Sequence, residues 1–312
     1  MLYNKFSQYL KKRYTTKVYK LPLNLPVTCP NRDGKISKVG CVFCGEEGAG
    51  FENLPNYLSV REQLSQNSKY IGKNYKSEKF IAYFQNYSNT YLPLEDFKRY
   101  IDEACVDDVV AIYISTRPDC IWKDYLLYLK NIKVTKGIDI VIELGLQTVN
   151  YHTLKKLNRG HLLAEFIHAV LLIKSYGLET CAHYILDIPM DSLDDTIEGA
   201  RILSALGVEQ VKCHSLYILK DTPLGKMYQK GEITPVGMEE YIERAISFLE
   251  YLNPNIVVQR LIGRAPKERS LFCNWGKSWW KIQELLEKKM EEESRFQGKK
   301  YNYLSCGFLD NC

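Results

Sequence analysis

Three cysteines stand close together near the start of the sequence. Cys29, Cys41 and Cys44 follow the pattern C-x11-C-x2-C in a stretch that is rich in glycine and polar residues. Two thiolates at C-x2-C spacing can bind one metal centre from a tight turn, and the flanking glycines relieve that turn sterically. The pattern therefore predicts a metal site.

The number of thiols distinguishes two kinds of metal site. A structural zinc ion normally takes four Cys or His ligands, and the nearest further candidates are Cys105 and Cys120, in a predicted helix and at a predicted strand end. A [4Fe–4S] cluster is normally held by four thiolates, so three thiolates leave one iron open for an exchangeable ligand. The spacing favours a three-thiolate iron–sulfur site. A zinc site with a distant fourth ligand is the alternative.

Composition indicates a globular protein without membrane segments. The 312 residues are 46% hydrophobic and 25% charged, and no stretch reaches the ~18 apolar residues of a membrane helix. The polar start lacks a secretory signal, so we expect a cytoplasmic protein whose ten cysteines are reduced thiols or metal ligands. The net charge of +5 permits a nucleic-acid partner without indicating one.

Short apolar runs alternate with amphipathic segments along most of the chain. This alternation predicts parallel βαβ units, in which the active site lies at the carboxyl ends of the strands. Strands are expected at 18–24, 80–85, 109–115, 139–146, 178–186, 209–218 and 255–260, and helices at 94–105, 162–177, 192–207 and 281–296, several of them closed by glycine. We call the segment that follows the first strand and carries Cys29, Cys41 and Cys44 the cysteine loop. It lies at the carboxyl end of that strand, where the active site is expected.

The composition changes after residue 262. The segment that follows is rich in Trp and basic residues and leads into a charged helix. We therefore expect residues 1–262 to form the core with an N-terminal extension, and residues 263–312 to form a C-terminal extension that packs on this core.

The order of several motifs is similar to that of a known family. The C-x-aromatic-C pair of Cys41 and Cys44, with a third cysteine upstream, resembles a radical S-adenosylmethionine (SAM) enzyme, and the wide x11 gap resembles the branch of the Elongator catalytic subunit. VYKLPLNLPVTCPNRDG, AYFQNYSNTY, ISTRPDC, IELGLQTVN, LNRGH and a late FQGK run in the order of the bacterial YhcC/YtqA-type family. The resemblance implies an α/β fold, a partial (βα)6 TIM-like radical SAM barrel with a C-terminal helical extension.

The same resemblance implies the cofactors. Cys29, Cys41 and Cys44 would hold three irons of a [4Fe–4S] cluster, and the amino and carboxylate groups of SAM would chelate the fourth. Reduction, by an electron donor such as flavodoxin or ferredoxin, would cleave SAM to methionine and a 5′-deoxyadenosyl radical. The protein would place the cofactor and protect the radical.

Five further residues are candidates for binding SAM. Arg159 can pair with a carboxylate, and similar enzymes use an arginine near this place. Glu143 and Gln147 are four residues apart, so on a strand they share a face, where the family binds ribose or the methionine amino group. Phe43 would pack near the adenine, and the backbone from Tyr217 onward would pair with its edge. A surface arginine and a satisfied interior polar pair are the structural alternatives.

Other polar residues are candidates without one assigned role. Gln85, Ser115, Arg117 and Asp119 end predicted strands and are expected to line either the cofactor or the substrate pocket. His183 and His214 lie within strands, and Cys273, Cys306 and Cys312 have no compact ligand spacing, with Cys273 as the one candidate on the substrate side. The family commonly has a Gly-Leu-Pro-Gly-Glu-like turn after the fifth strand, where this sequence has Asp187-Ile188-Pro189-Met190-Asp191. This departure leaves the SAM contacts near Asp187 undefined.

Basic residues and tyrosines suggest an RNA substrate. Lys5, Lys11, Lys12, Arg13, Lys17 and Lys20 are interleaved with Tyr3, Tyr9, Tyr14 and Tyr19, and Arg260, Arg264, Lys267 and Arg269 follow the last strand. Such a surface suits a single-stranded RNA loop, although a solvated basic face is equally consistent with it.

The family resemblance also implies a particular substrate and reaction. It implies action on the tRNA anticodon loop, at wobble uridine 34, converting 5-carboxymethylaminomethyluridine to 5-aminomethyluridine. The methylene between the amine and the carboxylate would give a stabilised radical. A radical SAM reaction on a small metabolite and a zinc-stapled RNA-binding module remain the alternatives.

Overall fold

The computed structural model describes residues 1–45, 48, 50 and 53–302, so Cys306 and Cys312 lie outside the described residues. The chain divides into two compact units. We call residues 7–145 and 164–181 the N-terminal unit, and residues 1–6, 146–163 and 182–312 the C-terminal unit. Two strands, β4 and β5, contribute residues to both units.

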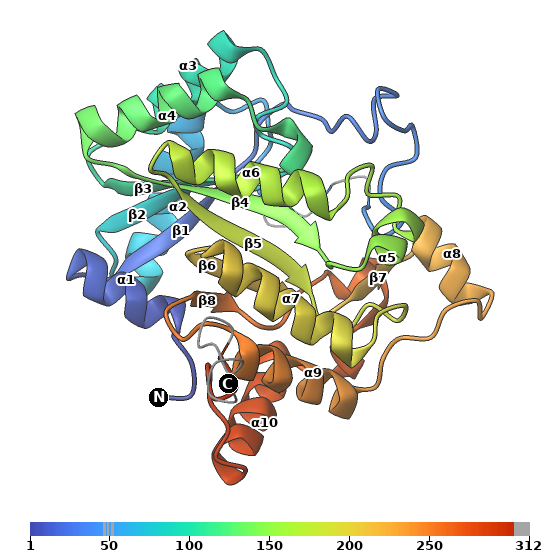
Figure 1. Cartoon of the computed structure of the whole chain (residues 1–312). Helices are drawn as coiled ribbons and strands as arrows, with labels where there is room; N and C mark the ends of the chain where they lie inside the picture. The colour runs from blue at the N-terminus through green and yellow to red at the C-terminus, as the bar shows by residue number, and fades with distance from the viewer. Residues whose placement is uncertain (46–47, 49, 51–52, 303–312) are drawn as a thin grey trace, which may run out of the picture. The chain divides into compact units, whose positions relative to one another are not determined.

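Helices and strands alternate along the chain (Figure 1). The strands are β1 (Val18–Leu23), β2 (Lys79–Phe84), β3 (Val109–Thr116), β4 (Asp139–Gln147), β5 (Glu179–Ile185), β6 (Gln210–His214), β7 (Tyr217–Leu219), β8 (Val257–Arg260) and β9 (Ser270–Cys273). The α-helices are α1 (Phe6–Tyr14), α2 (Val60–Tyr75), α3 (Leu94–Ala104), α4 (Lys123–Lys136), α5 (Tyr151–Lys156), α6 (Leu163–Ser175), α7 (Leu193–Leu206), α8 (Pro223–Gln229), α9 (Met238–Tyr251) and α10 (Trp279–Glu292).

Seven strands form one sheet in the order β1-β2-β3-β4-β5-β6-β8. The pairs β1–β2, β2–β3, β3–β4 and β6–β8 are parallel, as the βα alternation predicts. Each of the seven predicted apolar runs contributes a strand to this sheet. The strand β8 adds a seventh strand to the six of the expected (βα)6 arrangement.

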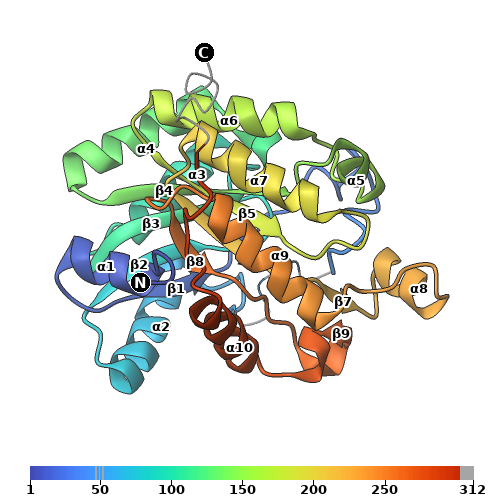
Figure 2. The same ribbon diagram turned by 60° about the horizontal axis from the view of Figure 1, so that its bottom comes forward.

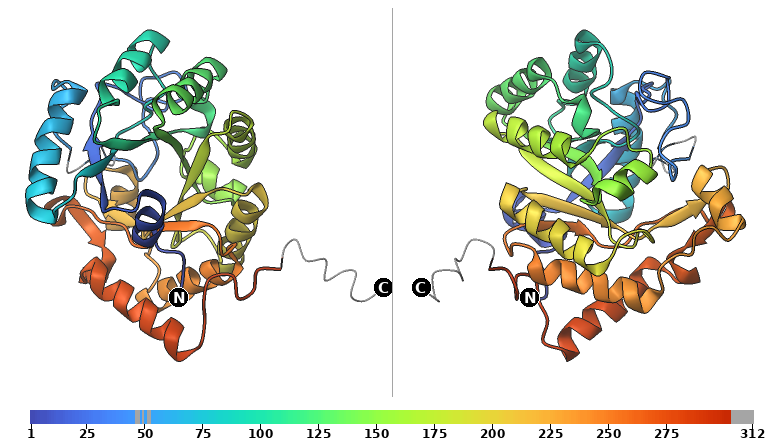
Figure 3. Two further views of the ribbon diagram at one scale, coloured as in Figure 1. Left: turned by 90° about the vertical axis from the view of Figure 1, so that its left-hand side faces the viewer. Right: turned by 45° about the vertical axis from the view of Figure 1, so that its right-hand side comes forward.

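The helices of the N-terminal unit cover one face of its strands. In Figure 1 and Figure 3 (left), α2, α3, α4 and α6 lie along the outer side of β1–β4. The helix α3 shows why, because Phe97, Ile101 and Ala104 recur at helical spacing and are all buried. The glycines at 177 and 207, with φ of 73° and 61°, close α6 and α7 as predicted.

One predicted strand, 209–218, is wrong as a single element. It breaks into β6 and β7, and β7 pairs antiparallel with β9 in a separate two-stranded sheet. The break lies at Ser215 and Leu216. The Leu216 N–H donates to Asp187 Oδ1 (2.6 Å), and Ser215 Oγ donates to Asn274 Oδ1 (2.7 Å). These side-chain bonds replace sheet bonds, and the sequence run alone does not reveal them.

In the C-terminal unit, α10 packs against α9 (Figure 2). The buried residues of α10 are Ile282, Leu286 and Met290, which lie along one face of the helix. The domain boundary at residue 262 stays a prediction. Among the described residues, none of the helices combines the length and apolar character needed to cross a membrane.

Candidate functional site

The cysteine loop follows β1 and is fixed by backbone hydrogen bonds. The Cys29 carbonyl accepts from the N–H groups of Arg32 (2.8 Å) and Asp33 (3.2 Å), and the Cys44 N–H donates to the Cys41 carbonyl (3.0 Å). Gly40 has a φ of 79°, and a Cβ at this position would press on the Arg32 side chain. The turns therefore hold the three cysteines on one ordered loop.

Nitrogen donors point at two of the three sulfurs. Asn31 is fully buried and its Nδ2 donates to Cys41 Sγ (3.4 Å), while Arg117 Nη1 lies 4.0 Å from Cys29 Sγ. The Arg117 guanidinium is close enough to interact electrostatically with both Cys29 and Cys41. Such N–H groups and a nearby positive charge stabilise thiolates and tune the potential of a bound cluster.

Arg117 is held in place by Asp119. Two guanidinium nitrogens, Nε and Nη2, each donate to one carboxylate oxygen of Asp119 at 2.8 Å. This two-point pair fixes the plane of the guanidinium, and only 5% of the Arg117 side chain is exposed. The end of β3 therefore supplies a rigid cation at the cysteine loop.

The loop after β2 presents buried oxygen atoms at the same end of the sheet. Within the described residues, Asn86 Oδ1, Ser88 Oγ and Asn89 Oδ1 are buried without a hydrogen-bond partner, whereas Asn89 Nδ2 donates to three carbonyls. Gly48 of the cysteine loop lies against this segment, because a Cβ there would overlap Asn86 Oδ1. Buried oxygens without donors are costly, so they favour a ligand with N–H or O–H groups.

Glu143 lies in the middle of β4 and is fully buried. Its Oε1 pairs with Lys20 Nζ of β1 at 2.6 Å, and Ser115 Oγ lies 3.4 Å from its Oε2. Phe43 lies half-buried between Cys41 and Cys44. The N-terminal unit thus contains the three cysteines, Phe43 and Glu143.

The other three predicted site residues lie in the C-terminal unit. Gln147 is half-buried and has a φ of 78°, so the regular strand geometry that would place it on the face of Glu143 ends there. Arg159 is buried and its Nη2 lies 2.9 Å from His161 Nε2. Tyr217 is half-buried in β7, and β9 occupies one edge of that strand. Their role in SAM binding stays a prediction.

Two family models match the chain. The model of the Radical SAM superfamily matches residues 27–203, more than half of the chain, and the model of the Radical_SAM C-terminal domain matches residues 208–292. The chain belongs to the radical SAM superfamily. It is therefore a member of an enzyme superfamily whose cofactors are a [4Fe–4S] cluster and SAM, and iron–sulfur chemistry replaces the zinc alternative for the cysteine loop.

The similar proteins include one that covers this radical SAM chain almost end to end. It is 31% identical to the uncharacterized protein YtqA of Bacillus subtilis over 303 residues, which cover 97% of this chain and 94% of YtqA. It is 28% identical to the tRNA uridine(34) acetyltransferase of Methanocaldococcus infernus, with 62% of this chain and 35% of that protein covered.

A solved structure supports the fold. The archaeal Methanocaldococcus infernus Elp3 with an N-terminal deletion superposes with a TM-score of 0.66 at 18% identity, covering 90% of this chain and 64% of that chain. The expected α/β, TIM-like radical SAM fold is therefore confirmed.

The residues present fit the superfamily's cofactors. The cysteine loop offers three sulfur ligands with N–H donors beside two of them, and the loop after β2 offers oxygen acceptors for the amino and hydroxyl groups of SAM. The sequence already indicated the cysteines by their spacing. It places Arg117 at a strand end beside the cofactor or substrate pocket, but it does not indicate that Arg117 and Asn31 contact sulfur, because these contacts depend on tertiary structure.

The basic residues of α1 lie at the other end of the strands of the N-terminal unit. Arg13 of α1 pairs with Asp139 and Glu179 at 2.7 Å each, and these are the first residues of β4 and β5. Figure 3 (left) accordingly shows α1, in dark blue, across the strand ends of the N-terminal unit. Lys20 points into the unit and pairs with Glu143. Arg13 and Lys20 of the predicted basic cluster therefore have structural roles, because ion pairs hold both side chains, whereas Lys11 and Lys12 are exposed.

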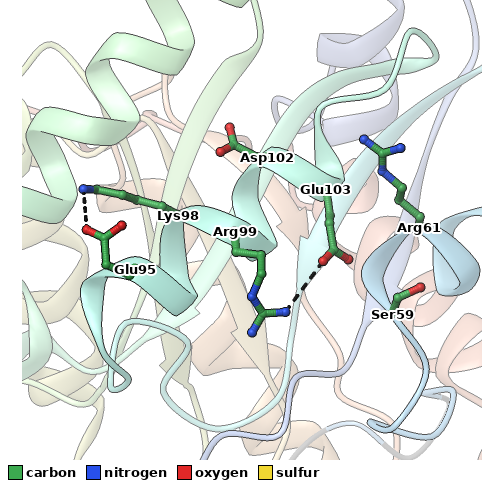
Figure 4. Close-up of a pocket in the computed structure, with 7 residues that line it drawn as sticks. All are labelled: Ser59, Arg61, Glu95, Lys98, Arg99, Asp102 and Glu103. Atoms are coloured by element: carbon green, nitrogen blue, oxygen red, sulfur yellow. Dashed lines mark hydrogen bonds and ion pairs between the residues drawn. The ribbon is translucent and has the colours of Figure 1, made fainter.

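A surface cavity of about 650 Å³ lies on α2 and α3 (Figure 4). Charged side chains line it, and Lys98–Glu95 (2.8 Å) and Arg99–Glu103 (3.7 Å) are paired with one another. None of the residues that line it is a predicted site residue. The radical SAM site is therefore assigned to the cysteine loop and not to this cavity.

Proposed function

We propose that this radical SAM protein acts on tRNA at wobble uridine 34 and converts 5-carboxymethylaminomethyluridine to 5-aminomethyluridine. The observation that carries the radical SAM part is the cysteine loop, in which Asn31 and Arg117 direct N–H groups at Cys41 and Cys29. The tRNA part is supported by the similarity to a tRNA uridine(34) acetyltransferase.

The residues have separate roles in this proposal. Cys29, Cys41 and Cys44 would hold the cluster, and the oxygens after β2 would accept from SAM, with Gln147, Arg159, Phe43 and Tyr217 as further SAM contacts. When bound, the cluster and SAM supply a 5′-deoxyadenosyl radical for hydrogen abstraction, with the electron coming from a donor such as flavodoxin or ferredoxin. Arg117 offsets negative charge at the thiolates.

The surface at the carboxyl ends of the strands suits an RNA loop. Lys35, Lys38 and Lys123 are exposed there, and so are the aromatic rings of Tyr57 and Trp122. Basic residues neutralise phosphates and aromatic rings stack on unpaired bases. We propose this surface, and not α1, as the tRNA-binding surface.

Nucleoside analysis tests this function. A strain lacking the gene is restored with wild type, Cys41→Ala or Cys105→Ala, and digested bulk tRNA is analysed by mass spectrometry. We expect 5-carboxymethylaminomethyluridine to accumulate in the null strain and with Cys41→Ala, and to fall with wild type and the Cys105→Ala control. Equal nucleoside profiles in all strains would refute the tRNA substrate, and a small-metabolite substrate would then be the candidate.

A further inference from the structure

A buried ion pair lies inside the N-terminal unit, between Lys20 of β1 and Glu143 of β4. The Lys20 Nζ lies 2.6 Å from Glu143 Oε1, and the two side chains are 17% and 0% exposed. Both residues are in the middle of strands whose neighbouring positions are apolar. The pair is therefore an unusual feature of this part of the sheet.

Aromatic rings and a hydroxyl surround the pair. The Lys20 ammonium lies 4.5 Å from the ring centre of Tyr83 and 4.1 Å from that of Tyr113, on β2 and β3. Ser115 Oγ lies 3.0 Å from the Tyr83 hydroxyl and 3.4 Å from Glu143 Oε2. Four adjacent strands thus direct charged, aromatic and hydroxyl groups to one place.

The strand β3 connects this place to the cysteine loop. Side chains alternate along a strand, so Tyr113, Ser115 and Arg117 point to the same side, and the backbone at Arg117 is still extended (φ −89°, ψ 149°). Ser115 contacts Glu143, whereas Arg117 lies 4.0 Å from Cys29 Sγ. Ser115 beside the ion pair and Arg117 beside the expected cluster ligand Cys29 are therefore only two residues apart on one strand end.

Fold stability does not explain the pair. Removing two charges from water is costly, and well-packed hydrophobic residues of the same volume often stabilise a protein as well as a buried ion pair does. The helix-covered face of the same strands is apolar, with Leu21, Ile112 and Ile142 almost completely buried. A buried cation beside a buried anion, close to the expected radical site, points to a ligand that carries both charges.

We propose that Lys20 and Glu143 recognise the zwitterionic side group of the substrate, with Lys20 binding its carboxylate and Glu143 its secondary ammonium. This inference rests on the proposed function, and it assigns Glu143 to the substrate in place of the SAM contact that the family resemblance implies. The carboxymethylaminomethyl group carries both charges on either side of one methylene, so each charge of the pair has a partner. The product carries an aminomethyl group without the carboxylate, so it cannot make the contact with Lys20.

Binding without turnover tests this assignment. The protein with its cluster, but without SAM, is titrated with two anticodon stem-loops that differ only in carrying a carboxymethylaminomethyl or an aminomethyl group at uridine 34. We expect wild type to bind the first about 10- to 100-fold more tightly, as for a charge-assisted contact. The double variant Lys20→Met/Glu143→Gln should bind both equally, and Lys12→Met on the exposed side of α1 should keep the preference.

The outcomes separate this inference from the proposed function. A double variant that retains the wild-type preference would overturn the assignment of Lys20 and Glu143. If the double variant does not fold, the affinities of the wild-type protein still test the proposal. Equal binding of the two stem-loops by wild type would refute recognition of the carboxylate. Turnover of the first stem-loop with SAM and reductant is measured separately, and its absence in wild type would refute the proposed reaction.

Discussion

Asp187 is a carboxylic acid in a place where the family resemblance expects glycine. It follows β5 and is 1% exposed, its Oδ1 accepts from the Leu216 N–H, and its Oδ2 has no partner among the described residues. Burial raises the pKa of Asp187 to about 7. The side chain therefore fixes the break between β6 and β7 while one of its oxygens stays available for a ligand.

This raised pKa predicts how stability depends on pH. The folded protein holds the Asp187 proton up to about pH 7 and the unfolded chain releases it near pH 4, so the free energy of unfolding falls as the pH rises between these values. Asp187→Asn should remove this slope and stabilise the protein at pH 8 by up to about 4 kcal/mol. Urea unfolding from about pH 5 to about pH 8 measures it.

The exposed Asp194 provides the control. Asp194→Asn should keep the wild-type slope, because its carboxylate is solvated in both states. If Asp187→Asn and wild type lose stability equally as the pH rises, Asp187 is ionised in the folded protein and the assignment is wrong.

Single residues differ in how far the sequence reveals them. The three cysteines could be predicted because their spacing is local and their chemistry is specific. The sequence places Lys20 among the N-terminal basic residues and does not reveal its partner, since Glu143 lies 123 residues away and only the sheet brings them together. Likewise, the two-point contact of Arg117 with Asp119 is local, but its contact with Cys29 spans 88 residues.

Among the elements of the N-terminal unit, the two ends of the strands have different roles. At the amino ends, Arg13 of α1 ties the first residues of β4 and β5 together. At the carboxyl ends lie the cysteine loop, with Lys35 and Lys38 exposed, and the segment after β3, with Trp122 exposed. This division is why we propose the end that holds the cysteines as the tRNA-binding end.

The division predicts a difference between lysine variants. Lys35→Ala/Lys38→Ala should weaken tRNA binding and lower the slope of log affinity against log salt by about two, roughly one for each lost phosphate contact. Lys11→Ala/Lys12→Ala, on α1, should leave both quantities unchanged. Filter binding over a range of salt concentrations gives the slopes. Loss of binding in the α1 variant alone would reverse the assignment of the two ends.

Helices and strands could be predicted from the sequence where the local residue pattern alone determines the element. The apolar runs of β2, β3 and β4, rich in β-branched or aromatic residues, are buried along nearly their whole length, so composition alone identifies them. The run at 209–218 also contains alternating apolar residues, but the bonds of Leu216 to Asp187 and of Ser215 to Asn274 turn the chain out of the sheet. Such contacts between distant residues are not encoded in local propensity.

At the scale of the whole chain, the C-terminal unit takes residues from both ends of the sequence. The Gln297 N–H donates to the Leu2 carbonyl (2.8 Å), and the Tyr3 hydroxyl donates to Glu287 Oε1 (2.8 Å). Glu250 of α9 is 1% exposed and accepts from Arg295 (2.8 Å) and Lys300 (2.6 Å). Although burial opposes its ionisation, these two cations lower the pKa of Glu250.

These contacts predict that a chain ending at residue 262 does not fold. Truncation would expose the surface that Ile282, Leu286 and Met290 cover, at a cost of about 5–9 kcal/mol, and would leave Glu250 buried without its cations. That loss is comparable to the roughly 5–15 kcal/mol that stabilises a typical domain. Circular dichroism during urea unfolding should show no cooperative transition for residues 1–262, whereas the exposed control Lys288→Ala should match wild type. A cooperative transition within about 1 kcal/mol of wild type would instead make residues 263–312 an independent appendage, because the core would then be complete without them.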